Sequence, residues 1–361
     1  MSLEHYVSVG RCGLRVSPFT LGTMTFGQPT WGTDAPQSGR ILDRYLELGG
    51  NSVDTANNYA RGWSEKIIGD HLAGQSAKRA RLVLATKFVC SLFPGDPNAG
   101  GAGKKAVVAQ LEESLRRLRT DHVDLYWMHA WDRLTPIDET LRALDDLVRA
   151  GKVRYVGFSN TPAWKVAQAQ VLASLRGWTS LAALQVEYSL LERTSEGELA
   201  PAALELGLGV FPWSPLKNGV LSGKYMRANR SAQNPTRGAL ALPALTDERT
   251  YDTVERVADI AGQLGVPPAA IALAWLREQP QVSSTIIGVS SLEQLEANLS
   301  ALDVRLDASQ LRALDDATRP QLDFPAELLT FVGRAAYAGT TINGKLYPAT
   351  PFAPQSDAER A

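Results

Sequence analysis

Four side chains suited to acid–base chemistry stand at or just beyond the ends of short apolar segments. Asp54 and Tyr59 belong to the stretch DTANNYARGWSE, Lys87 lies in ATKF, and His129 lies in WMHAWD. Together, a carboxylate, a phenol, an ammonium and an imidazole can deliver a proton to an oxygen atom on which negative charge develops. Taken singly, each also has an ordinary explanation, as a helix cap, a surface ring, a solvated strand end or a buried histidine.

One reaction that needs all four groups is the reduction of a carbonyl. Hydride arriving at the carbon leaves negative charge on the oxygen, and Tyr59 is the candidate donor of the neutralising proton. A phenol ordinarily titrates near pH ~10, and an adjacent Lys87 ammonium is expected to lower that pKa. Asp54 would keep the buried Lys87 charged, while a neutral His129 would orient the carbonyl.

These residues need a scaffold that brings strand ends together, and the chain alternates between strand and helix patterns. Apolar or β-branched segments long enough for buried strands are 19–24, 51–56, 81–88, 122–130, 153–160, 181–188, 208–215 and 284–289. Helical spacing of apolar residues is found, among others, at 38–50, 104–120, 138–152 and 291–302. Eight such alternations predict an α/β fold, a closed (β/α)8 TIM barrel, in which reactive groups lie at the carboxyl ends of the strands.

The first strand is not followed by a G-x-G-x-x-G turn, since its sequence continues as LGTMTFG. A dinucleotide would therefore not bind here in a Rossmann crevice, which disfavours an open doubly wound sheet. Before the first strand, residues 5–18 alternate around two glycines like a β-hairpin, expected to plug or cover one end of the barrel.

Three further segments follow the seventh strand. A long connection at 217–247 is of the length that usually serves function or mobility, and 308–319 reads as an extra amphipathic helix. The tail from 320 has no periodicity, and 354–361 is expected to be disordered. We expect one barrel domain over 1–361, with an ordered core of about 5–320 and the tail, 321–361, near the active-site mouth.

Composition points to small-molecule partners. The 361 residues are 44% hydrophobic and carry 37 basic and 38 acidic side chains without long charge runs, so we expect neither nucleic-acid nor membrane binding. No stretch reads as a signal peptide or a membrane span, which predicts a cytoplasmic protein and leaves a homo-oligomer open. Neither the two cysteines nor the four histidines have metal-ligand spacing, so no metal is expected and a metal-dependent hydrolase is disfavoured.

Over nearly its whole ordered length the chain resembles the aldo-keto reductases. The family pattern D-x-x-x-x-Y-x-x-G-x-S-E stands at Asp54, Tyr59, Gly62, Ser64 and Glu65, and the family's lysine and histidine match Lys87 and His129. Further matches are G-x-S-N at 157–160, Q-x-E-Y at 185–188, W-S-P-L at 213–216 followed by S-G-K-Y, and Gly288 with Gln294 and Asn298. Gly62, Ser64 and Glu65 are expected to shape the turn and cap the next helix.

The resemblance implies a reductase of aldehydes or ketones that also runs in reverse with alcohols, using hydride from a nicotinamide dinucleotide. It implies that Ser159, Asn160 and Gln185 contact the carboxamide group of the nicotinamide, and that Trp213 stacks against the nicotinamide ring. The long connection would close over the cofactor like a belt. The remaining cofactor positions that it implies are Gly22, Thr23, Met24, Ser214, Pro215, Leu216, Gly219, Lys224, Gly288, Ser290, Gln294 and Asn298.

The chain departs from many relatives after Gly288, where no Arg or Lys is positioned for an adenosine 2′-phosphate. Ser290, Ser291 and the following helix start can still bind phosphate through hydroxyls and backbone amides. NADPH is therefore favoured, with NADH as the alternative. Residues of the long connection that could add positive charge are Lys217, Arg230 and Arg237.

The sequence specifies the substrate pocket less clearly than the catalytic residues. Apolar or aromatic residues beside the proposed carbonyl site, each of which could equally be core or rim, are Met24, Trp31, Phe88 and Trp131, with Phe331 and Tyr337 as a cover from the tail. Few basic residues lie near them, which disfavours phosphorylated or strongly acidic substrates. The alternative function is a dinucleotide-binding regulatory subunit resembling the potassium-channel β subunits.

Overall fold

The eight segments expected to be barrel strands all belong to one parallel sheet that closes into a barrel. The computed structural model describes residues 2–228, 244–354 and 356–360. Around the barrel the strand order is β10-β3-β4-β5-β6-β7-β8-β9. Val210 closes the ring, because its N–H donates to Gln281 O at 3.0 Å and its carbonyl accepts from Ser283 N at 2.9 Å. The strands are β3 (Phe19–Gly22), β4 (Ser52–Asp54), β5 (Val83–Phe88), β6 (Val123–Met128), β7 (Val153–Ser159), β8 (Leu181–Glu187), β9 (Gly209–Trp213) and β10 (Thr285–Gly288).

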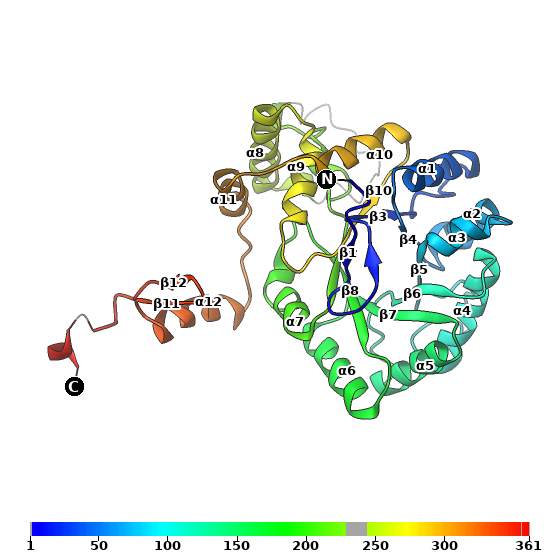
Figure 1. Ribbon diagram of the computed structural model, residues 1–361, viewed down its shortest axis with the longest axis horizontal. Helices are drawn as coiled ribbons and strands as arrows, with labels where there is room; N and C mark the ends of the chain where they lie inside the picture. Colours follow the sequence, from blue (N-terminus) through cyan, green and yellow to red (C-terminus); the bar gives the residue numbers. More distant parts are fainter. Residues whose placement is uncertain (1, 229–243, 355, 361) are drawn as a thin grey trace.

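Helices surround this sheet, as expected for a TIM barrel (Figure 1). They pack through apolar stripes at helical spacing; α5, for example, buries Ile137, Leu141 and Leu144. The helices are α1 (Ala35–Glu47), α2 (Trp63–Leu72), α3 (Ser76–Arg81), α4 (Lys104–Leu118), α5 (Ile137–Arg149), α6 (Ala163–Arg176), α7 (Leu199–Leu206), α8 (Glu248–Leu264), α9 (Pro268–Arg277), α10 (Leu292–Leu299) and the predicted extra helix α11 (Ala308–Ala317). Short helices are η1 (Tyr59–Gly62), η2 (Thr194–Glu196), η3 (Val220–Ser222), η6 (Ala244–Thr246) and η7 (Ser300–Leu302).

The N-terminal hairpin plugs the end of the barrel where the strands begin, as predicted. Its strands are β1 (Val7–Ser8) and β2 (Arg15–Val16), and the neighbouring Val9 packs with Val16 into the barrel interior, both fully buried. Gly10 has a φ of 52°, and a Cβ atom there would lie 2.3 Å from the carbonyl oxygen of Gly207. Glycine is therefore required for the hairpin to seat on the barrel.

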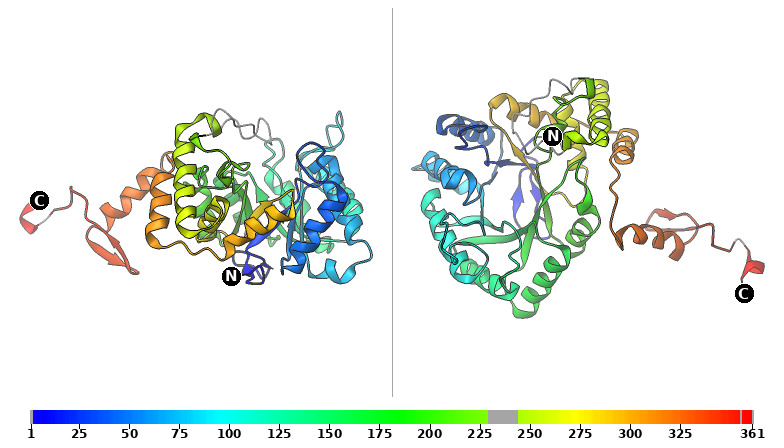
Figure 2. Two further views of the ribbon diagram at one scale, coloured as in Figure 1. Left: turned by 90° about the horizontal axis from the view of Figure 1, so that it is seen from above. Right: turned by 180° about the vertical axis from the view of Figure 1, so that it is seen from behind.

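The tail differs from expectation in structure and in place. It forms a helix, α12 (Ala326–Ala336), a hairpin of β11 (Thr340–Ile342) and β12 (Lys345–Tyr347), and a final turn, η8 (Asp357–Glu359). Figures 1 and 2 show these elements projecting away from the barrel. Phe331 and Tyr337 are 40% and 47% exposed, so they do not cover the barrel mouth as predicted. The prediction that the tail lacks periodicity is wrong, because apolar residues of α12 recur at helical spacing, at Leu328, Phe331, Val332 and Ala335. Its Ala, Leu and Glu residues also favour helix.

No single helix in the described ranges is long and apolar enough to cross a membrane. Helices α8 and α9 satisfy the length and composition criteria only as a pair, and they are bent by 97° relative to each other.

Candidate active site

The four residues singled out for acid–base chemistry meet at the carboxyl ends of β4, β5 and β6. Lys87 is fully buried, and its Nζ forms an ion pair with Asp54 Oδ2 and donates to Tyr59 Oη at 3.0 Å. A third bond, to the carbonyl of Thr55 at 2.8 Å, uses the remaining ammonium proton. The ring of His129 stands perpendicular to that of Tyr59, with centroids 5.9 Å apart. Asp54 and Lys87 thus lie beneath a half-buried phenol and imidazole.

An unusual turn places the phenol. Tyr59 begins η1, where Ala60, Arg61 and Gly62 have φ values of 47°, 59° and 91°, all in the left-handed region. Two non-glycine residues in this region store backbone strain, which is typical of functional turns. Gly62 also abuts the Arg117 side chain, since a Cβ atom would lie 3.1 Å from Arg117 Cδ.

Ser64 and Glu65 stabilise the site through tertiary contacts, and our prediction that they cap α2 is wrong. The Ser64 hydroxyl donates to the Thr23 carbonyl at 2.8 Å, which joins α2 to the end of β3. Glu65 is fully buried and pairs with Arg117 of α4 at 2.7 Å. The N-cap of α2 is Gly62, with no side-chain cap. The motif therefore fixes the helix against its neighbours, through a partner distant in sequence.

The electrostatics keep Lys87 charged, as expected. Burial disfavours the ammonium, but the Asp54 carboxylate more than offsets this effect and raises the pKa of Lys87 above its usual value. For Tyr59 the expectation was wrong in sign. Burial raises the pKa of the phenol, and the opposing effect of Lys87 does not bring it below its usual value. Tyr59 therefore carries its proton at neutral pH, and Lys87 limits the rise.

His129 is held neutral. Burial and the Lys87 ammonium lower the pKa of His129 to about 3. Its Nδ1 faces the sulfur of Cys90 at 3.9 Å. The side chain of Asn160 donates to the His129 carbonyl at 2.9 Å and so fixes the backbone that carries the ring. A neutral imidazole at this point can orient a carbonyl oxygen through a hydrogen bond.

The neutral state of His129 predicts that the protein loses stability as the pH falls below about 6.5. The folded state keeps the imidazole neutral down to about pH 3, so below pH ~6.5 the unfolded chain binds more protons. The free energy of unfolding should then fall by up to ~1.4 kcal/mol per pH unit. Urea unfolding at about pH 7.5 and about pH 5.5 measures this fall in the free energy of unfolding, which should be smaller for His129→Asn than for the unmodified protein. Equal falls would contradict the neutral state assigned to His129.

A second polar group lies beside the four residues. Ser159 ends β7, and its fully buried hydroxyl has no hydrogen-bond partner among the described residues. Asn160 follows with a φ of 47° and accepts a bond from the indole of Trp213 at 3.2 Å. Gln185 donates to Asp54 Oδ1 at 3.0 Å, a contact that sequence reasoning missed. Gln185 therefore also orients the carboxylate partner of Lys87.

The phosphate side of the predicted cofactor site is formed from turns. Four residues after β9, namely Ser214, Lys217, Asn218 and Gly219, have φ values of 53°, 46°, 55° and 90°. Lys217 is not available as the extra positive charge, because its Nζ lies 2.7 Å from Glu187. Arg230 and Arg237 lie outside the described residues, as do residues 229–243 of the predicted belt. The positions nearby are the buried Pro215, the half-buried Leu216 and the exposed Lys224.

At the opposite side, the ends of β3 and β10 pair directly, with Gly22 in register with Gly288. Thr23 is fully buried and bonds through its hydroxyl to the carbonyl of Asp54 at 3.0 Å, so its side chain serves the scaffold. The first turn of α10 is capped internally, because Gln294 Oε1 accepts from the N–H of Ser290 at 2.9 Å. Two further residues predicted to contact the cofactor differ from each other in exposure. Met24 is half-buried, whereas Asn298 is buried, with 6% of its surface exposed.

Of the predicted substrate residues, Phe88 does not face the pocket, so that prediction is wrong. Side chains alternate along a strand, so Lys87 points into the barrel and Phe88 points outward, fully buried against Tyr126 at 4.7 Å between ring centroids. Trp131 is half-buried and stacks edge-on against Trp164 of α6 at 5.2 Å. Trp164 is 57% exposed and was not foreseen. Trp31 is half-buried.

In the described part of the chain, no group of three His, Cys, Asp or Glu side chains is arranged to hold a metal ion.

Comparisons with known proteins identify the family of the chain. The family model of the aldo/keto reductase family matches residues 18–319. An uncharacterized oxidoreductase, YrpG of Bacillus subtilis, is 41% identical over 320 residues, covering 86% of this chain and 95% of that protein. Norsolorinic acid reductase stcV of Emericella nidulans is 34% identical, covering 90% of this chain and 84% of that protein. Aryl-alcohol dehydrogenase GME11368 of Pestalotiopsis microspora is 32% identical, covering 91% of this chain and 86% of that protein. The chain therefore belongs to the aldo/keto reductase family of oxidoreductases.

Proposed function

We propose that the protein is an NADPH-dependent carbonyl reductase that converts an aldehyde or ketone into the alcohol, reversibly, with Tyr59 as the general acid. One observation carries the proposal: the Lys87 ammonium bonds Tyr59 Oη at 3.0 Å while paired with Asp54. This arrangement stabilises negative charge on Tyr59 once the proton has left. A surface tyrosine would have no use for a buried cation beneath it.

In this mechanism the half-buried Tyr59 and His129 face the substrate, and Lys87 and Asp54 act from below. The imidazole of His129 holds the carbonyl oxygen, and Tyr59 donates its proton to that oxygen as negative charge develops. Lys87 then stabilises the phenolate. When an alcohol is oxidised the same proton returns to Tyr59, which acts as the base.

The residues fit a nicotinamide cofactor, the kind that aldo-keto reductases use. A nicotinamide dinucleotide supplies or accepts the hydride when bound. The unpartnered hydroxyl of Ser159 is the observation that supports the fit, because a buried hydroxyl without a partner costs stability unless a ligand satisfies it. Asn160 and the free oxygen of Gln185 would complete the contacts to the carboxamide, and Trp213 would present a ring for stacking.

NADPH is proposed over NADH because it is the general choice of the family. Ser290, Ser291 and the N-terminus of α10 offer hydroxyl and amide donors for a phosphate. Gln294 would have to release the N–H of Ser290 to free that donor. Since Lys217 is paired with Glu187, this site relies on hydrogen bonds more than on charge.

Aromatic carbonyl compounds are the proposed substrate class. Two relatives are named for norsolorinic acid reduction and for aryl-alcohol dehydrogenation. In this chain Trp131, two residues beyond His129, and Trp164 form a perpendicular aromatic pair. Such a pair can pack against a flat substrate ring.

The test is a cofactor titration followed by a substrate screen. NADPH and NADH are titrated by tryptophan fluorescence, and the tighter cofactor is then assayed with aromatic aldehydes, aliphatic aldehydes and ketones. We expect tighter NADPH binding and fastest turnover of aromatic aldehydes. Binding without turnover across the whole panel would overturn the enzyme proposal and favour a dinucleotide-binding regulatory subunit.

Replacing Ser159 with alanine should separate folding from cofactor binding. Without cofactor, Ser159→Ala should raise the free energy of unfolding by about 1 kcal/mol, because it removes an unsatisfied buried hydroxyl. The Kd for NADPH should rise by about tenfold, the effect of losing one well-made hydrogen bond. Ser52→Ala is the matched control, since this buried hydroxyl accepts from Thr20 at 3.0 Å and its loss should destabilise the protein without changing Kd.

A further inference from the structure

The proposed role of His129 requires one particular tautomer of its ring. A neutral imidazole carries its proton on only one nitrogen, so it donates through that nitrogen and accepts through the other. To hold a carbonyl oxygen, His129 must present an N–H to the substrate. Its Nδ1 faces the sulfur of Cys90 at 3.9 Å, which leaves Nε2 as the nitrogen that can meet a carbonyl. The proton must therefore reside on Nε2.

The thiol of Cys90 is suited to keep the proton there. Which nitrogen of a histidine is protonated depends on the hydrogen bond that the other nitrogen makes. An unprotonated imidazole nitrogen is a better acceptor than sulfur, so a bond from the thiol to Nδ1 is favoured over the reverse. Burial raises the pKa of the half-buried Cys90 thiol, and the Lys87 ammonium only partly opposes this rise. The thiol therefore keeps its proton at neutral pH and can donate it.

The backbone just before Cys90 has an unusual conformation. Val89 has a φ of 100°, which a β-branched residue rarely adopts. Strain of this kind persists only where the surrounding structure enforces it, and it is concentrated at functional sites. Val89 directly follows the last residue of β5, two positions after Lys87. The strained residue thus ends the regular alternation of the strand and sets the direction of the next side chain, that of Cys90.

Two buried amide side chains hold this conformation in place. Gln110 of α4 accepts from the N–H of Val89 at 3.0 Å. Asn57, from the stretch that carries Tyr59, donates to the carbonyl of Cys90 at 2.8 Å. Asn57 also donates to Gln110, at 2.8 Å. The position of Cys90 is therefore fixed by the same stretch that positions the proposed general acid.

The ring of His129 has one hydrogen-bond partner among the described residues, and that partner is Cys90. The backbone of the histidine is also fixed relative to the thiol, because its N–H donates to the carbonyl of Phe88 at 3.2 Å. Within the described part of the chain, Cys90 is thus the group placed to set the tautomer.

We propose that Cys90 is a positioning residue, whose thiol donates to Nδ1 of His129 and so keeps the imidazole proton on Nε2, facing the carbonyl oxygen of the substrate. The inference rests on the proposed reductase function. Cys90 acts through His129 and not on the substrate. Because a thiol is a weak donor, its effect is a shift in the proportion of the two tautomers.

The direct test is the ¹⁵N NMR spectrum of the histidine rings at neutral pH, without cofactor or substrate. The shifts of the two ring nitrogens lie far apart when one tautomer predominates, and they approach each other when both are populated. The protein has four histidines, and the signals of this ring are those that vanish in His129→Asn. We expect a predominantly Nε2-protonated ring, and a ring protonated on Nδ1 would overturn the proposal.

Two substitutions of Cys90 then test its role. Cys90→Ala removes the donor, so the two shifts should move toward each other. Cys90→Ser keeps a hydroxyl donor, so its shifts should stay closer to those of the unmodified protein. Shifts in Cys90→Ala that equal those of the unmodified protein would mean that another group sets the tautomer, which would overturn the proposal.

Kinetics give the second readout. Cys90→Ala should lower kcat/KM for carbonyl reduction by about two- to tenfold, the effect of losing one modest hydrogen bond, with the Kd for NADPH unchanged. Cys90→Ser should lie between Cys90→Ala and the unmodified protein. An unchanged kcat/KM in Cys90→Ala would remove Cys90 from the reaction.

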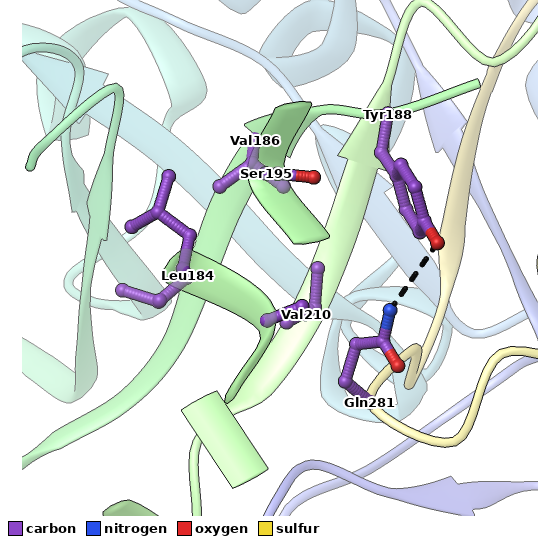
Figure 3. Close-up of a pocket in the computed structure, with 8 residues that line it drawn as sticks. Leu184, Val186, Tyr188, Ser195, Val210 and Gln281 are labelled. Atoms are coloured by element: carbon purple, nitrogen blue, oxygen red, sulfur yellow. Dashed lines mark hydrogen bonds between the residues drawn. The ribbon is translucent and has the colours of Figure 1, made fainter. Parts of the chain in front are cut away.

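Two controls separate this effect from a general loss of packing. Cys12→Ala removes the other half-buried thiol, beside the N-terminal hairpin. Gln281→Ala removes a buried contact remote from the site, the bond from Gln281 Nε2 to Tyr188 Oη at 3.5 Å shown in Figure 3. Both variants should leave the His129 shifts and kcat/KM unchanged, even where they lower stability.

Failure of the reductase function has a different signature, the absence of turnover with every carbonyl compound. The NMR measurement needs no turnover and still decides the contact. His129 shifts that respond to Cys90→Ala would support the hydrogen bond in that case, and shifts that do not respond would overturn it.

Discussion

Tyr59→Phe is expected to reduce kcat for carbonyl reduction by about 10²- to 10⁴-fold, the usual contribution of a positioned general acid. The phenol oxygen is the only atom removed, and it lies 3.0 Å from Lys87 Nζ. Without it, the carbonyl oxygen must take its proton from water. Steady-state NADPH oxidation with benzaldehyde at neutral pH measures the effect, and NADPH binding by fluorescence should be unchanged.

The control for this substitution is Tyr6→Phe. Tyr6 is 44% exposed, and its phenol donates at 3.1 Å to the carbonyl of Gly49, which precedes the start of β4 rather than its site-bearing carboxyl end. Its loss should leave kcat unchanged. If Tyr59→Phe retained more than about a tenth of the activity, Tyr59 would not be the general acid.

The positions of Asp54, Lys87 and His129 were predictable because strand ends in a parallel barrel share one face. The sequence marks each strand by a short apolar run, and the next polar residue falls at that face. Topology alone therefore brings together side chains that lie far apart in the chain. Three of the contacts that define the site, Lys87 with Asp54, with Tyr59 and with Thr55, follow from this convergence.

The features that could not be predicted depend on how deeply a side chain is buried and on which distant residues it contacts. Phe88 was assigned to the pocket because it adjoins Lys87, but neighbours on a strand face opposite sides. The pKa of Tyr59 was expected to fall because the charge of Lys87 was known and the burial of the phenol was not. Glu65 read as a local cap, since nothing in the sequence indicates that Arg117 is its partner.

A cavity bordered by Asn160 and Trp213, beside the proposed nicotinamide site, shows the same limit on a larger scale. Asn160, Ser195, Trp213 and Asp323 come from four separate segments. None has a motif spacing relative to the others, so only the folded chain reveals that they share a wall. The tail was expected near the mouth, and its first residues do border this cavity, whereas Phe331 and Tyr337 project away from it.

Lys87→Met is expected to remove both activity and a large part of the stability. Asp54 is 3% exposed, and without Lys87 its charge is buried with no cation beside it. Breaking a buried pair in this way typically costs about 3–5 kcal/mol. Urea unfolding should show this loss at neutral pH, and NADPH oxidation should fall by at least the factor expected for Tyr59→Phe, because the phenolate loses its stabilising charge.

The pH dependence identifies the cause of that loss. Burial raises the pKa of Asp54 even in the unmodified protein, where the Lys87 ammonium opposes the rise. In Lys87→Met that opposing charge is gone, so the pKa of Asp54 should rise further above its unfolded value near ~4, and the folded state can neutralise the carboxyl by binding a proton. The deficit in stability relative to the unmodified protein should therefore be small near pH ~4 and grow as the pH rises. A deficit independent of pH would indicate lost packing of the lysine stem instead.

The double variant Asp54→Asn with Lys87→Met separates stability from chemistry. It leaves no buried charge at these two positions. Gln185, which donates to Asp54 Oδ1 at 3.0 Å in the unmodified protein, can donate to the asparagine oxygen in the same way. Stability should return to within about 1 to 2 kcal/mol of the unmodified protein, because replacing both partners of a buried pair is far less costly than removing one. Activity should stay as low as in Lys87→Met. Recovery of both would mean that the ion pair only supports the fold, while recovery of stability alone assigns Lys87 to the stabilisation of the Tyr59 phenolate.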